Sequence, residues 1–138
     1  MVPSLKSRRG SVVTEATVVL PLLFLLVFAC LEYSWAYSRK IEVSTAARIA
    51  ARTAALAHST LADVETATAN QMASAGFGAG DWVLELEPSD PAAAEPGTPI
   101  FALIRADYDA VSLGGAGSLF PLPEEVTAAA AMRKEGNP

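Results

Sequence analysis

The chain has 138 residues, of which 51% are hydrophobic, and it carries a formal net charge of −5 and one cysteine. An acidic chain of this kind lacks the basic patch that phosphate binding requires, so nucleic acid is excluded as an expected partner. The single cysteine, Cys30, cannot form a disulfide within the chain, so no disulfide scaffold is expected.

The charges divide the chain into a short basic head and a long acidic remainder. Residues 1–10 carry Lys6, Arg8 and Arg9 and no acidic residue, whereas the rest carries seven basic and fifteen acidic residues. The apolar segment Ser11–Leu31 lies between them. As a helix it would be about 31 Å long, close to the thickness of the hydrocarbon core of a bilayer. Positive charge before such a helix predicts a cytoplasmic N-terminus and an extracytoplasmic C-terminus.

One carboxylate, Glu15, stands near the start of this apolar segment, five residues after Gly10. A carboxylate at the centre of a membrane helix costs about 2.5–3.5 kcal/mol on insertion scales, so a simple anchor has little reason to carry one. The order of basic residues, Gly10, four residues, Glu15 and an apolar helix resembles the cleavage site of type IV pilins and pseudopilins. The resemblance implies that a prepilin peptidase cuts between Gly10 and Ser11, and that the helix stays with the mature protein.

Other segments resemble the TadE-like pseudopilins of tight-adherence (Flp) pilus systems. The run Glu15–Leu23 looks like the beginning of that family's helix, and Glu32 stands where the family has a second acidic residue. Ala46–Arg52 resembles its Ala-Ala-Arg segment, and Ala131–Glu135 weakly resembles its last strand. Pro21, inside the first of these runs, lacks an amide donor and predicts a kink in the membrane helix.

The resemblance implies a minor pilin, or pseudopilin, that takes part in the assembly of a Flp-type pilus. It would sit in the bacterial inner membrane as a single-pass protein, from which it could enter the pilus. Glu15 would act in assembly by pairing with the new α-amino group of Ser11 on a neighbouring subunit. The implied partners are the prepilin peptidase, other pilins and pseudopilins, the inner-membrane assembly platform and membrane lipid.

The sequence indicates a structural component and not an enzyme. His58 is the only histidine, so no Ser-His-Asp constellation and no histidine-based metal site is expected. The sequence also has no second cysteine and no cofactor-binding motif, and we expect no cofactor. Gly114–Gly117 lacks the lysine and the strand–loop–helix setting of a phosphate-binding loop and is interpreted as a turn.

Three other interpretations of the N-terminal segment remain open. Val27–Cys30 is close to a lipoprotein processing site, although Phe28 is bulky for it, and Ser34–Ala36 could end a cleaved signal peptide. The segment could also be a plain uncleaved signal anchor. The competing function is then a signal-anchored, single-pass extracytoplasmic binding or sensor domain without a pilus role, and cleavage at Gly10 distinguishes the two.

The expected domains are a leader over residues 1–10, a transmembrane helix over 11–31 and a pilin-like domain over 32–138. Because alanine is the best helix former, the Ala-rich stretch predicts that the helix continues over about 32–58. Thr60 and Asp63 form a capping-box pattern that opens a second helix over about 61–75. The side chains expected on its buried stripe are Leu61, Val64, Thr68, Met72 and Ala75.

Three segments of period-two hydrophobicity follow and predict strands over about 81–87, 100–109 and 125–133. The last is rich in alanine, and its assignment as a strand rests partly on the family resemblance. The residues expected to face the core are Trp82, Leu84, Leu86, Ile100, Ala102, Ile104, Ala106, Tyr108, Val126, Ala128, Ala130 and Met132. The expected fold is therefore α+β and type IV pilin-like: a long N-terminal helix, a short helix and a small antiparallel sheet.

Overall fold

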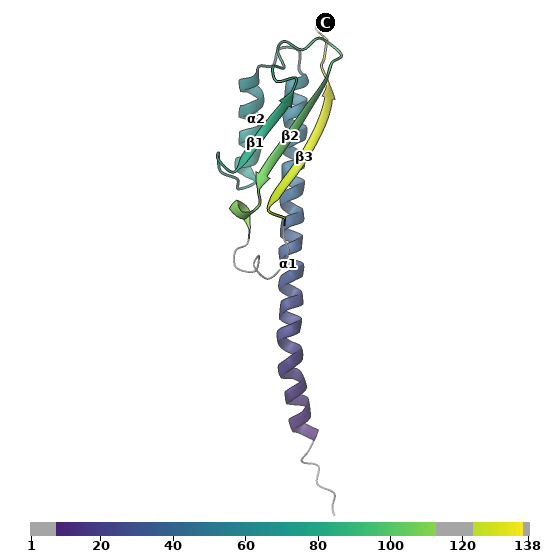
Figure 1. The fold of residues 1–138 in the computed structure, drawn as a ribbon, viewed down its shortest axis with the longest axis vertical. Helices are drawn as coiled ribbons and strands as arrows, with labels where there is room; N and C mark the ends of the chain where they lie inside the picture. Colours follow the sequence, from purple (N-terminus) through teal and green to yellow (C-terminus); the bar gives the residue numbers. More distant parts are fainter. Residues whose placement is uncertain (1–7, 113–122, 137–138) are drawn as a thin grey trace, which may run out of the picture.

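A computed structural model describes residues 8–112 and 123–136 and shows one long helix with a small α+β domain packed against its second half (Figure 1). Helix α1 spans Arg8–Ala55, helix α2 spans Leu61–Ser74, and a 3-10 turn covers Asp109–Val111. The strands are β1 (Trp82–Glu87), β2 (Pro99–Asp107) and β3 (Glu125–Arg133). The expected α+β fold is confirmed. The glycine-rich segment Gly114–Gly117 lies outside the described residues.

Helix α1 continues without interruption from its apolar half into the domain, and it includes Pro21. In the domain half, the side chains that face the sheet are small and fully buried, namely Val43, Ala46, Ala47, Ala50, Ala51 and Ala54. Alanine favours the helix and has no side-chain entropy to lose on burial. A ridge of methyl groups also lets the sheet approach the helix axis closely. This face of α1 therefore forms one side of the hydrophobic core.

Helix α2 is bounded by two sequence-encoded caps. At its start, the Thr60 side chain accepts from the Asp63 backbone amide at 3.3 Å, and the Asp63 carboxylate accepts from the Thr60 amide at 2.9 Å. The pKa of Asp63 is lowered, first by the hydrogen bond from the Thr60 backbone. At its end, Gly76 has φ +87°, and the amides of Gly76 and Phe77 donate to the carbonyls of Ala73 and Met72. This is a Schellman motif, for which glycine is suited because it lacks a Cβ.

The three strands form an antiparallel sheet in the order β1-β2-β3, with β2 in the centre. Along β2 the buried residues are Ile100, Ala102, Ile104 and Ala106, and they alternate with more exposed ones. This period-two pattern puts one face on α1 and leaves the other face exposed. Tyr108, one residue beyond the strand, is 1% exposed and continues the buried row.

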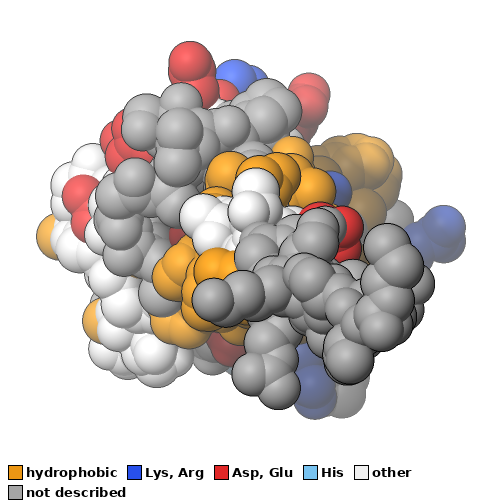
Figure 2. Space-filling model, turned by 90° about the horizontal axis from the view of Figure 1, so that it is seen from below, with side chains coloured by type: hydrophobic (Ala, Val, Ile, Leu, Met, Phe, Trp, Pro, Cys, Tyr) orange, Lys and Arg blue, Asp and Glu red, His pale blue; other side chains and the backbone are white. Residues whose placement is uncertain are grey.

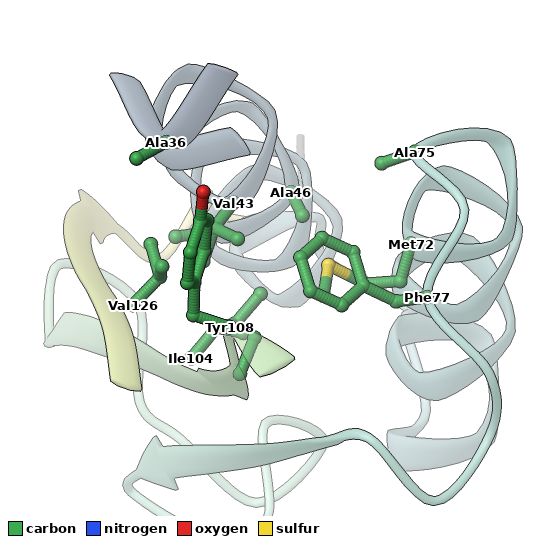
Figure 3. Close-up of a cluster of buried hydrophobic side chains, with 11 residues drawn as sticks. Ala36, Val43, Ala46, Met72, Ala75, Phe77, Ile104, Tyr108 and Val126 are labelled. Carbon is green, nitrogen blue, oxygen red and sulfur yellow. The ribbon is translucent and has the colours of Figure 1, made fainter. Parts of the chain in front are cut away.

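The largest core cluster lies where α1, α2 and the sheet meet (Figure 3). Phe77 and Met72 lie on the α2 side of this cluster, while Tyr108 extends from the end of β2 toward α1. A second cluster, nearer the end of α1, joins Ile100 and Ala102 to Val64 and the alanines of the ridge. The core is therefore built from large side chains on the sheet and α2 against small ones on α1.

Two residues expected in the core are exposed. Leu61 is 42% exposed because it lies in the first turn of α2, before the turns that bury Val64, Thr68 and Met72. Met132 is 39% exposed on the edge strand β3, although its partner Ile100 on β2 is fully buried. Helix α1 ends at Ala55, so no further turn of it is available to cover this end of β3.

The end of α1 is capped by the last residues of the chain. The buried Lys134 ammonium donates to the carbonyl oxygens of Ala54 at 3.2 Å and Leu56 at 2.6 Å. The Glu135 amide donates to the Ala55 carbonyl at 2.8 Å. A cation at a helix C-terminus satisfies carbonyls that have no partner within the helix and interacts favourably with the helix dipole. The C-terminal segment thereby fixes β3 against α1.

Replacement of this cap should lower the stability of the domain. We expect Lys134→Met to reduce the free energy of unfolding by about 1.5–3 kcal/mol, because buried carbonyls lose a charged donor. Arg133→Met is the matched control, since Arg133 is exposed, and it should stay within about 0.5 kcal/mol of the unaltered chain. Urea unfolding of the full chain in detergent, followed by circular dichroism, measures both. Equal effects of the two changes would contradict the capping role.

Candidate functional site

The first half of α1 carries all the residues that the sequence associates with processing and assembly. Gly10 and Ser11 lie in the first turn of the helix, Glu15 follows on its exposed surface, and Pro21 lies within it. The helix therefore holds the predicted cleavage position and the predicted assembly carboxylate one to two turns apart on a single element. Cleavage itself, the role of Glu15 and a kink at Pro21 remain predictions.

This half of the helix is apolar on all sides and is covered by no other part of the described chain. The large hydrophobic side chains from Val12 to Leu31 are between 45% and 69% exposed. An 18-residue window of α1 has a mean hydropathy of 2.4 and none of it is buried, so its length and composition would allow it to span a membrane. A helix that is hydrophobic all round needs lipid or other helices as its surroundings. Seen from the end where α1 begins, hydrophobic side chains gather near the middle of the molecule and acidic ones lie mostly toward its margin (Figure 2).

The helix meets the domain at a set of side chains that we call the collar: Glu32, Trp35 and Arg39. They are spaced three and four residues apart, so they share one face of α1. Glu32 is only 3% exposed, and its Oε1 accepts a hydrogen bond from the Tyr108 hydroxyl at 3.3 Å. Burial, followed by the charge of Glu32, raises the pKa of Tyr108 to about 12. The phenol therefore remains a donor to the carboxylate at all physiological pH values.

The other two collar residues reach different parts of the domain. The Trp35 indole Nε1 donates to the Val111 carbonyl at 2.6 Å, in the 3-10 turn after β2. The Arg39 guanidinium donates through Nη1 to the Ala75 carbonyl at the C-terminus of α2, and it stacks on Trp35 at 4.2 Å from the ring centroid. A cation there completes the C-cap of α2. The collar thus ties α1 to two parts of the domain, the turn at Tyr108–Val111 after β2 and the C-terminus of α2, which fixes the domain's orientation on the helix.

Sequence reasoning identified Glu32 only through the family resemblance and missed its partner Tyr108, 76 positions away. It did not foresee the hydrogen bond from Trp35 to Val111. It also missed Arg39 and Lys134 as cap residues. No local signal could have found them, because Arg39 lies within α1 and Lys134 follows a strand, whereas the capping pattern concerns basic residues in the last turn of a helix. The sequence does not say which helix end a distant cation reaches.

The surface around the collar offers hollows lined by charged and aromatic side chains. Within the described residues, no group of three or more His, Cys, Asp or Glu side chains is placed to hold a metal ion. Two hollows flank the collar end of the sheet. One, of about 550 Å³, is lined by Arg105 and five carboxylates, those of Asp81, Asp107, Asp109, Glu124 and Glu125. The other, of about 270 Å³, lies between α1 and the start of β3.

The comparison with protein families agrees with the resemblance seen in the sequence. The family described as TadE-like protein matches residues 10–52, which begin at Gly10 and end within the alanine ridge of α1. The resemblance to TadE-like pseudopilins is thereby confirmed over this segment, and the chain carries a TadE-like region associated with Tad/Flp pilus systems. Comparisons with curated proteins and with solved structures gave no match.

The collar predicts a pH dependence at high pH. Tyr108 ionises near pH 12 when folded and at its ordinary value of 10.0 when unfolded. The folded state therefore binds more protons between these values, and stability should fall as the pH rises through this window. Tyr108→Phe should remove this loss of stability between the two pKa values. It should also remove the last step of the absorbance titration that follows tyrosinate formation. Tyr37→Phe, at a position 68% exposed, should keep both. A late step that persists in Tyr108→Phe would contradict the assignment.

Proposed function

We propose that this chain is a minor pilin, or pseudopilin, that takes part in the assembly of a Flp-type (tight-adherence) pilus after processing by a prepilin peptidase. One observation carries the proposal: the TadE-like match begins at the predicted cleavage residue and covers the entire exposed apolar helix. The uncovered helix supports it, since a subunit that packs beside others in a bundle must keep that surface free before assembly.

In the proposed sequence of events, the precursor sits in the inner membrane with the basic leader on the cytoplasmic side and the domain outside. The peptidase cuts between Gly10 and Ser11, where glycine leaves the backbone accessible. The mature helix then leaves the bilayer sideways into a bundle of pilin helices. Glu15 pairs there with the freed α-amino group of Ser11 of a neighbour. In a low-dielectric bundle such a charge persists only when it is matched, so the pair sets the axial register.

The collar gives this mechanism its rigid coupling. Because Glu32 and Trp35 bind the turn after β2 and Arg39 binds the C-terminus of α2, the domain has little freedom to rotate about α1. A register set at Glu15 is then transmitted along one unbroken helix to the domain surface. The other pilins, the assembly platform and the peptidase are the partners of this proposal.

The processing step has a direct test at the N-terminus. Mass analysis of the membrane form should give Ser11 as the first residue, and Gly10→Val should accumulate as precursor because a branched side chain obstructs the scissile bond. Val12→Ala is the control and should be processed. A mature N-terminus at Met1, Cys30 or Tyr37 would contradict the proposal and favour a signal anchor, a lipoprotein or a cleaved signal peptide respectively.

The assembly step has its test at Glu15. Glu15→Leu should be cleaved and remain stable in the membrane but fail to enter pili, because one charge of a buried pair is left unmatched at a cost of about 3–5 kcal/mol. Glu15→Asp keeps the charge with a shorter reach and should fall between. The measurement is the fraction of each variant in sheared pili. Normal incorporation of Glu15→Leu would reject this role and favour a signal-anchored binding domain.

A further inference from the structure

The smaller hollow is a groove on the side of α1 that the collar leaves free. It has a volume of about 270 Å³. The helix wall consists of Tyr33, Ala36, Tyr37 and Lys40, and the other wall consists of Pro123, Glu125, Val126 and Thr127 at the start of β3. Strand β3 is at the edge of the sheet, so part of its backbone hydrogen-bonding groups face away from β2. The groove thus combines aromatic surface, the edge of the sheet, one cation and one carboxylate.

If α1 crosses a bilayer, as the proposed function requires, the groove begins at the depth of the lipid headgroups and extends outward from them. The apolar run ends at Leu31. At 1.5 Å per residue, Tyr33 stands about 3 Å and Tyr37 about 9 Å beyond it. The headgroup layer extends roughly 5–7 Å beyond the hydrocarbon core. The Lys40 side chain starts about 14 Å out but leans toward the helix N-terminus, so its ammonium can reach back toward the outer edge of that layer.

The charges of the groove select among headgroups. Lys40 supplies a cation for a phosphate, while Glu125 and the faces of Tyr33 and Tyr37 suit an ammonium group. Glu125 also lines the neighbouring 550 Å³ hollow with four further carboxylates, and among the described residues that line it the one basic side chain, Arg105, is 3.5 Å from Glu85. This acidic surrounding disfavours a headgroup with net negative charge. It favours one that carries its own positive charge next to the phosphate.

We propose that the groove between α1 and β3 binds the headgroup of a zwitterionic phospholipid, with the phosphate at Lys40 and the ammonium at Glu125 between the two tyrosines. The bound lipid would hold the domain at a fixed height and tilt on the membrane surface. The proposal depends on the membrane insertion of α1 and not on cleavage or pilus entry.

The test uses the full chain in nanodiscs of equal parts phosphatidylethanolamine and phosphatidylglycerol. The protein is released into detergent, and native mass spectrometry counts the lipid molecules of each kind that stay bound to it. The unaltered chain should retain phosphatidylethanolamine roughly threefold to fivefold over phosphatidylglycerol, the size expected of one partly exposed ion pair. Glu125→Gln should bring this ratio close to one, because the carboxylate no longer discriminates. Lys40→Gln should reduce the retention of both lipids, because both carry the phosphate.

The matched controls are Glu87→Gln and Arg48→Gln, which remove one negative and one positive charge from the same sheet and the same helix but outside the groove. Both should behave as the unaltered chain, and all variants should keep the late titration of Tyr108 as evidence of folding. Equal retention of the two lipids by the unaltered chain, or equal behaviour of groove and control variants, would overturn the proposal. Displacement of the lipid by millimolar phosphoethanolamine would assign the groove to a soluble ligand instead. If a chain that is not cleaved at Gly10 still retains phosphatidylethanolamine preferentially, the lipid proposal holds even though the pilus role fails.

Discussion

The whole structure depends on one helix that has to satisfy two different surroundings without a break. In its first half, α1 exposes large hydrophobic side chains on every side, and no described part of the chain covers them. In its second half, the buried face consists of alanines with one valine at its start, and the large core side chains come from the sheet and α2. A bulky residue on the ridge would push the sheet away, whereas a small residue in the apolar half would weaken contact with lipid or neighbouring helices. The composition of α1 therefore changes where its surroundings change.

The collar lies at this change and explains why charged residues occur there. A carboxylate, an indole and a guanidinium would be costly on a buried helix face without partners. Each has one: Tyr108 for Glu32, the Val111 carbonyl for Trp35 and the Ala75 carbonyl for Arg39. Because these partners belong to two separate segments, the turn after β2 and the C-terminus of α2, the same contacts that compensate for burial also prevent rotation of the domain about α1. Lys134 does the same at the far end of the domain, so α1 is held at both ends of its buried face.

Sequence patterns predicted the local features well because those depend on neighbouring residues. The capping box at Thr60, the glycine that ends α2 and the alternating burial of β2 each follow from spacings of a few residues. The alanine-rich strand β3 was foreseen only with help from the family resemblance, since alanine favours a helix and a tertiary partner has to override that preference. The exposure of Met132 and the bonds of Lys134 depend on where α1 ends, and the bond of Tyr108 depends on Glu32, which is 76 positions away. No local pattern contains that information.

A single-pass anchor and an assembling subunit place different demands on this architecture. An anchor needs only an apolar segment, and a flexible connection to its domain would serve it equally well. Here the connection is a continuous helix, and buried polar contacts lock the domain to it directly outside the apolar run. Such rigidity is useful when the position of the helix has to determine the position of the domain surface. It is also why a headgroup bound beside the collar could influence the domain: the lipid, the helix and the sheet would then share one rigid frame, and the depth of α1 in the membrane would set the height of the whole domain.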